Sequence, residues 1–126
     1  MRINIFFIKL LFSSDNKYVI IKSQKEDNLV KNSPTDKNAK INKNKIFAYI
    51  KALQEYGTRI GKPIVKHIEG NLWELRPLSN RIFFFYWKDN KFVLVHHFIK
   101  KSQKTPRKEI ETAMRNVKDW IERNGN

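Results

Sequence analysis

Two strand-length runs of aromatic and β-branched residues limit the folds open to this chain. The runs are RIFFFYW at residues 81–87 and FVLVHHFI at residues 92–99, and both are too short for typical helices. Between them stands the sequence KDNK, in which Asp89 and Asn90 suit the central positions of a tight hairpin turn. The sequence therefore predicts an antiparallel hairpin, which a third strand at residues 72–76 extends through the turn sequence PLSN.

Helices are expected before and after this meander. The first has an apolar stripe at helical spacing, formed by Ile46, Ile50 and Leu53. It is expected to end near Tyr56, because Gly57 is placed to adopt the left-handed conformation. The last helix is expected to open with Thr105 as its N-cap and Pro106 at its first position. Its core stripe consists of Ile110, Ala113, Met114, Val117 and Ile121, and Gly125 lies past its end.

Residues 1–45 differ in composition from the rest of the chain. Residues 3–12 and 18–21 are β-rich, which indicates a hairpin or one strand with an irregular extension. Residues 22–45 are half Lys and Asn, and we expect a mobile or weakly helical connection unless AT-rich codon usage explains the bias. The predicted organisation is an N-terminal segment, 1–45, and an α+β core, 46–126, with helices packed on one face of a small antiparallel sheet.

The charge balance narrows the classes of partner. There are 26 Lys and Arg against 12 Asp and Glu, a net charge of +14, which favours a polyanion such as nucleic acid or an anionic surface. The absence of Cys excludes a disulfide scaffold and a thiol nucleophile. No apolar run approaches the roughly 18 residues of a membrane span, and Lys9 interrupts the apolar N-terminal stretch. We therefore expect a cytoplasmic protein without a membrane partner.

Hairpin geometry sorts the strand side chains onto two faces. The expected cross-strand pairs are Trp87 with Phe92, Phe83 with His96, Arg81 with Phe98, Glu74 with Phe83, and Arg76 with Arg81. One face is apolar and carries Trp73, Leu75, Ile82, Phe84, Tyr86, Val93, Val95, His97 and Ile99. The other face mixes cations with exposed aromatic rings and carries Glu74, Arg76, Arg81, Phe83, His96, Phe98 and Lys100. This mixture binds phosphates and stacks bases, although an ordinary wet sheet face with a Glu74 ion pair to either arginine is the alternative.

A cationic loop follows the last strand and leads into a helix N-terminus, which also attracts phosphate. Its basic side chains are Lys100, Lys101, Lys104, Arg107 and Lys108. His96 and His97 make a poor metal site, because neighbouring strand residues point to opposite faces. We expect neither a metal nor another cofactor.

Several of these pieces occur together in a known family. They are Tyr56-Gly57, the sequence WELRP at 73–77 followed by Arg81, the sequence HFIKK at 97–101, and QKTP at 103–106. In order and spacing, residues 46–122 resemble the phage-derived Gp49-like, HigB-type toxins of the RelE/ParE superfamily. The resemblance implies an α+β toxin of a type II toxin–antitoxin system, with Arg76, Arg81, Lys100 and Lys101 on its active surface.

The resemblance also implies an activity and partners. Such toxins are mRNA interferases, commonly acting on ribosome-bound message, and a HigA-type helix-turn-helix antitoxin holds them inactive. Operator DNA is expected to be contacted only through the antitoxin. Apolar residues of the N-terminal segment, namely Phe6, Phe7, Leu10 and Leu11, are candidates for part of the antitoxin contact.

RNA can be cut without a metal when the ribose 2′-OH attacks the adjacent phosphate. Arginines stabilise the negative charge that develops on the phosphate. Arg81 is expected to be exposed at the start of a strand, where the backbone directs it toward the substrate. The general base is His96, Glu74 or a lysine such as Lys100. Further RNA contacts are assigned to Lys101, Lys104, Arg107, Lys108, Phe83 and Phe98. The rival hypotheses are a ParE-like toxin that poisons DNA gyrase and a nucleic-acid-binding module without enzymatic activity.

Overall fold

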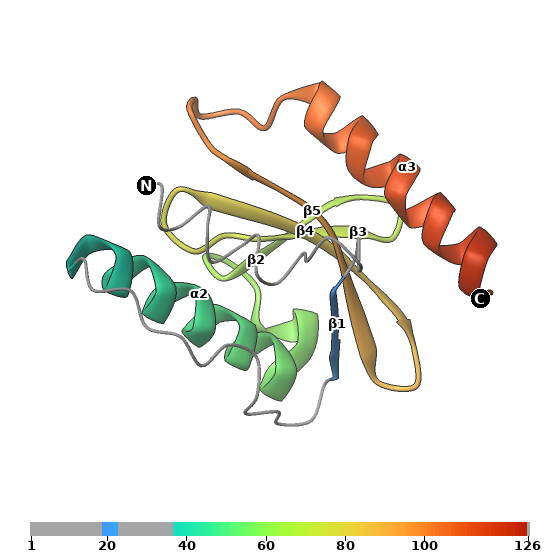
Figure 1. The fold of residues 1–126 in the computed structure, drawn as a ribbon, viewed down its shortest axis with the longest axis horizontal. Coiled ribbons are helices and arrows are strands. Elements are labelled where there is room, and N and C mark those ends of the chain that lie inside the picture. The colour runs from blue at the N-terminus through green and yellow to red at the C-terminus, as the bar shows by residue number, and fades with distance from the viewer. Residues whose placement is uncertain (1–18, 23–36, 126) are drawn as a thin grey trace.

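The described part of the chain folds into a five-stranded antiparallel sheet with two long helices. The computed structural model describes residues 19–22 and 37–125 (Figure 1). The strand order is β1-β5-β4-β3-β2, and the expected α+β class is confirmed. The elements are β1 (Val19–Lys22), α2 (Lys37–Tyr56), the 3-10 turn η1 (Gly57–Ile60), β2 (Val65–Glu69), β3 (Leu72–Leu75), β4 (Asn80–Lys88), β5 (Lys91–Ile99) and α3 (Arg107–Asn124). The β-rich run at 3–12 lies outside the described residues.

The central hairpin of β4 and β5 has the expected turn. Asp89 and Asn90 both have positive φ, 54° and 60°, as a two-residue turn of this kind requires. The expected pairs are confirmed for Arg81 with Phe98 and for Phe83 with His96, and Glu74 pairs with Phe83 on the other side of β4.

Two irregularities in this hairpin overturn part of the expected register. Tyr86, not Trp87, pairs with Phe92, and Tyr86 is 49% exposed. Val95 is an extra residue in β5, because Phe83 pairs with His96 and the next residue, Phe84, pairs with Leu94. The shift places Val93 and Val95 in the cluster that contains Phe83 and not with Ile82 as expected.

The two helices cover opposite faces of the sheet, so the expectation that they share one face is wrong (Figure 1). Side chains of α2 pack with one set of strand residues: Leu75, Ile82, Phe84 and Leu94. Side chains of α3 pack with the alternate set: Leu72, Phe83, Phe85, Val93 and Val95. The physical reason is the unbroken aromatic run in β4, which is buried on both faces and needs a cover on each.

The helix boundaries show which local signals decide. α2 ends at Tyr56 and Gly57 has φ +65°, as expected, but the helix begins at Lys37, so the expected boundary at residue 45 falls inside it. α3 ends before Gly125, whose N–H donates to the Ile121 carbonyl at 2.7 Å. Thr105 is not its N-cap: Pro106 holds that position without a side-chain hydrogen bond.

Strand β2 was not predicted from the sequence. It pairs with β3 through Val65–Leu75, Lys66–Glu74 and His67–Trp73, and its register shifts between His67 and Glu69. This shift interrupts the alternation by which strands are found. Neither helix in the described part of the chain is both long and apolar enough to traverse a bilayer.

Candidate nucleic-acid interface

Antiparallel topology gathers basic residues at one end of the sheet. β3 ends there, β4 begins there and β5 ends there, which brings Arg76, Arg81 and Lys100 together. The Lys100 N–H donates to the Ser79 carbonyl at 2.8 Å, so the start of the cationic loop is joined to the β3–β4 turn. Because β5 ends at Ile99, Lys101 lies beyond the strand, and the alternation of side chains between the two sheet faces does not determine its direction.

A buried carboxylate lies at the centre of this end. Glu74 is 1% exposed, and its Oε1 lies 3.5 Å from Arg76 Nε and 3.9 Å from Arg81 Nε. Its Oε2 accepts a hydrogen bond of 3.2 Å from the Thr105 hydroxyl. Both ion pairs that the sequence allowed are therefore present, and the loop before α3 contacts the carboxylate through Thr105.

Arg81 is buried, contrary to the expectation of an exposed side chain. It is 5% exposed, and its Nη1 donates to the carbonyls of Leu78 and Asn80, each at 2.8 Å. Burial lowers the pKa of the Arg81 guanidinium, while the nearby Glu74 carboxylate raises it. Arg76 differs, because a quarter of its side chain is exposed. Arg76 is thus the guanidinium of this cluster that can meet an anion from solvent.

His96 lies on the α3 face in contact with two phenylalanine rings. Its Nε2 is 2.7 Å from Oε1 of Glu109, and its side chain is 23% exposed. The ring centroids of Phe83 and Phe98 are 6.2 Å and 6.4 Å from that of His96. Phe83 is fully buried, so it supports His96 and offers no ring to RNA, whereas Phe98 is half-buried.

The basic side chains of the loop differ in their contacts with other protein groups. Lys101, Lys104 and Lys108 are exposed. Arg107 is bound to both carboxylate oxygens of Glu69, at 2.7 Å and 3.2 Å. That contact lowers the pKa of Glu69 and raises the pKa of Arg107. Arg107 therefore ties the end of β2 to the start of α3.

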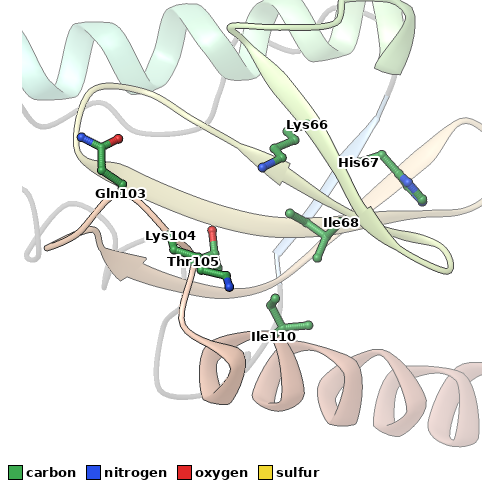
Figure 2. Close-up of a pocket in the computed structure, with 7 residues that line it drawn as sticks. All are labelled: Lys66, His67, Ile68, Gln103, Lys104, Thr105 and Ile110. Atoms are coloured by element: carbon green, nitrogen blue, oxygen red, sulfur yellow. The ribbon is translucent and has the colours of Figure 1, made fainter.

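An open pocket of about 410 Å³ lies between β2 and the loop (Figure 2). Lys66 and Ile68 form one side, while Lys104, Thr105 and Ile110 come from the loop and α3 (Figure 2). Lys66 is the cross-strand neighbour of Glu74, which places it beside the buried cluster. The sequence prediction missed Lys66, because it depended on a strand that the alternation did not reveal.

The sequence that forms this site matches a known protein family. A family model described as phage derived protein Gp49-like (DUF891) matches residues 34–118, from before α2 into α3. The comparison with curated proteins gives no match. The matched range covers well over half of the chain and contains the sheet end with its buried carboxylate. The chain therefore belongs to the Gp49-like family of phage-derived proteins, a family of RelE/ParE-like toxins from toxin–antitoxin modules.

Proposed function

We propose that this protein is an endoribonuclease, an mRNA interferase of the HigB type that cleaves ribosome-bound message without a metal. The observation that carries the proposal is the basic sheet end. There Arg76 is partly exposed beside the buried Glu74 carboxylate, and the exposed cations Lys66, Lys101 and Lys104 lie on the neighbouring strand and loop. Such an arrangement suits a phosphodiester whose flanking phosphates need neutralisation.

In the proposed reaction the ribose 2′ oxygen attacks the adjacent phosphorus. The bond from phosphorus to the 5′ oxygen breaks, which leaves a 2′,3′-cyclic phosphate and a 5′-hydroxyl. The base accepts the proton of the 2′-OH, and the departing 5′ oxygen takes up a proton from water. Arg76 donates to the phosphate oxygens in the transition state, and Lys100 binds a flanking phosphate.

His96 is the base that the contacts favour. The Glu74 carboxylate is 1% exposed beneath the loop, which leaves little room for a ribose hydroxyl. The Glu109 carboxylate at His96 Nε2 favours the tautomer that carries its proton on Nε2. That tautomer leaves Nδ1 as the proton acceptor.

The partner in the cell is an antitoxin, as membership in a toxin–antitoxin family implies. We propose the HigA type, a helix-turn-helix protein that also binds the operator DNA. The net charge of +14 accelerates association with an acidic partner and makes that association salt-sensitive. Phe6, Phe7, Leu10 and Leu11, the candidate apolar contacts, lie outside the described residues. A pull-down from the native operon at low salt should recover both proteins; recovery of the toxin alone would contradict the assignment.

The test of the activity is RNA cleavage by the purified protein, with and without ribosomes. We expect 2′,3′-cyclic phosphate ends, and a loss of about 100-fold or more in Arg76→Ala. Arg115→Ala is the matched control, because Arg115 is an exposed arginine whose recorded bond is to Thr112 on the same helix. Folded protein that binds RNA without cutting it would favour a binding module. Growth arrest with intact message and inhibited gyrase would favour a ParE-like toxin.

A further inference from the structure

We infer that Glu74 and Thr105 are positioning residues, whose contact fixes the cationic loop against β3 and holds Arg76 in place for the phosphate. The inference rests on the proposed ribonuclease activity, which it deepens. It assigns a role to Thr105 that the sequence prediction did not, and it makes Glu74 a group that acts through Arg76 and not a proton acceptor.

The buried carboxylate of Glu74 orients the Arg76 guanidinium. Glu74 Oε1 and Arg76 Nε face each other at 3.5 Å, and both atoms are buried without a hydrogen-bond partner among the residues that the structure describes. A buried ionic pair that falls short of a hydrogen bond is costly, and such shortfalls are uncommon in folded proteins. The guanidinium is therefore oriented by Glu74 without being saturated by it. Its remaining N–H groups are free to turn toward an anion, since a quarter of the side chain is exposed.

Thr105 does not cap the helix that it precedes. Its place before Pro106 is that of a helix N-cap, which stabilises a helix by about 1 kcal/mol. In the structure the N-terminus of α3 has no side-chain cap, and the Thr105 hydroxyl donates instead to Glu74 across 31 positions of sequence. The helix forgoes this stabilisation, and the loop gains a fixed point on β3.

The loop between β5 and α3 is held near both of its ends. Lys100 is anchored to Ser79 at the start of the loop, and Thr105 is anchored to Glu74 near its end. Thr105 also lines the pocket that Lys66 and Lys104 share (Figure 2). The hydroxyl contact thus sets the distance between the loop cations and Arg76. A misplacement of about 1 Å at such a site can lower a rate about 100-fold.

The experiment compares single-turnover cleavage by the full chain for wild type, Thr105→Val and Thr105→Ser. Valine keeps the shape and removes the donor, so we expect the rate at saturating toxin to fall about 10- to 100-fold. The half-saturating concentration should change by much less, because the loop lysines remain. Serine restores the donor and should restore most of the rate. Thr112→Val is the control, since that hydroxyl serves Arg115 on α3.

A second variant guards against misfolding. Glu74→Asp keeps the charge but withdraws the carboxylate by one methylene, and it should show the same loss in rate at saturation. If Thr105→Val or Glu74→Asp is folded and cleaves at the wild-type rate, the inference is overturned while the ribonuclease assignment stands. If serine fails to restore a loss caused by valine, the hydroxyl has no positioning role. If wild type does not cleave at all, the proposed function fails, and the inference fails with it.

Discussion

His96 Nε2 and Glu109 Oε1 lie 2.7 Å apart, and this contact joins the C-terminal half of β5 to the first turn of α3. Both side chains are about one fifth exposed, at 23% and 20%. The pair lies on the same sheet face as Phe83. Because Phe83 pairs with His96 on one side and with Glu74 on the other, strand β4 separates His96 from Glu74. The candidate base and the candidate phosphate-binding arginine are therefore positioned by different elements.

Substitution of His96 separates catalysis from binding. His96→Gln should lower single-turnover cleavage by about 10²–10⁴-fold, because it removes the proton acceptor. RNA affinity and its salt dependence should persist, because phosphate contacts come from Arg and Lys. The pH–rate profile is the decisive measurement: its rising limb should vanish in the variant. An unchanged profile would move the base to a lysine.

Substitution of Arg81 should be a stability change as much as an activity change. Arg81→Ala removes two 2.8 Å bonds to backbone carbonyls and one charge facing the buried Glu74. We expect a loss of about 2–4 kcal/mol in the free energy of unfolding. Urea denaturation measures this, with Arg76→Ala as the comparison that should cost less, because Arg81 adds the two backbone bonds to its ion pair. Equal, small losses in both variants would show that the buried arginine has no structural role.

Acid should weaken the tie between β2 and α3. Arg107 lowers the pKa of Glu69 in the folded chain, so the folded state binds its proton less readily than the unfolded state. The resulting stabilisation is fully present above about pH 5 and is lost as the pH falls through the lowered pKa. Glu69→Gln should therefore reduce the melting temperature slightly at neutral pH, and this difference should shrink as the solution is acidified. A titration of the Glu69 carboxyl by NMR at its ordinary value would contradict the contact.

The irregularity at Val95 should depend on a helix side chain. Asn116 Nδ2 donates to the Val95 carbonyl at 2.7 Å, which serves the extra residue of β5. Asn116→Ala should cost about 1–3 kcal/mol, because it removes a hydrogen bond from the part-buried carbonyl of Val95. Asn124→Ala is the control, since its amide contacts the last turn of α3 at an exposed position. Similar free energies of unfolding in both variants would argue against this role of Asn116.

Local chemistry predicted much of this fold. The Asp89-Asn90 turn set the hairpin, Gly57 ended α2, and alternation gave the pairs of Arg81 and Phe83. The extra residue in β5, Val95, could not be predicted from the sequence, because the side chain that donates to its carbonyl is Asn116 of α3, 21 positions away. The placement of both helices on one face failed for a related reason. Alternation assigns side chains to faces, but it does not say which faces helices will cover.

The sequence indicated which residues gather at the candidate site, but not how buried they are or what they contact. The resemblance and the register both indicated Arg76, Arg81 and Lys100, and the topology gathers them at one end. Burial was the missing quantity: Glu74 and Arg81 are both buried, and the hydroxyl that Glu74 accepts from belongs to Thr105, 31 positions along the chain. Thr105 looked like a helix cap because local sequence cannot reveal a competing tertiary acceptor.

Pairing of β1 with β5 has a consequence for the order of folding. β2, β3, β4 and β5 are consecutive and joined by short turns, whereas Val19 of β1 pairs with Leu94. Short closures form quickly and long ones slowly, so the meander should assemble first and β1 should add to a finished edge. During synthesis β1 is made well before its partner strand. Conservative changes at Ile20 should therefore alter the unfolding rate, while changes at Phe84 should alter the folding rate.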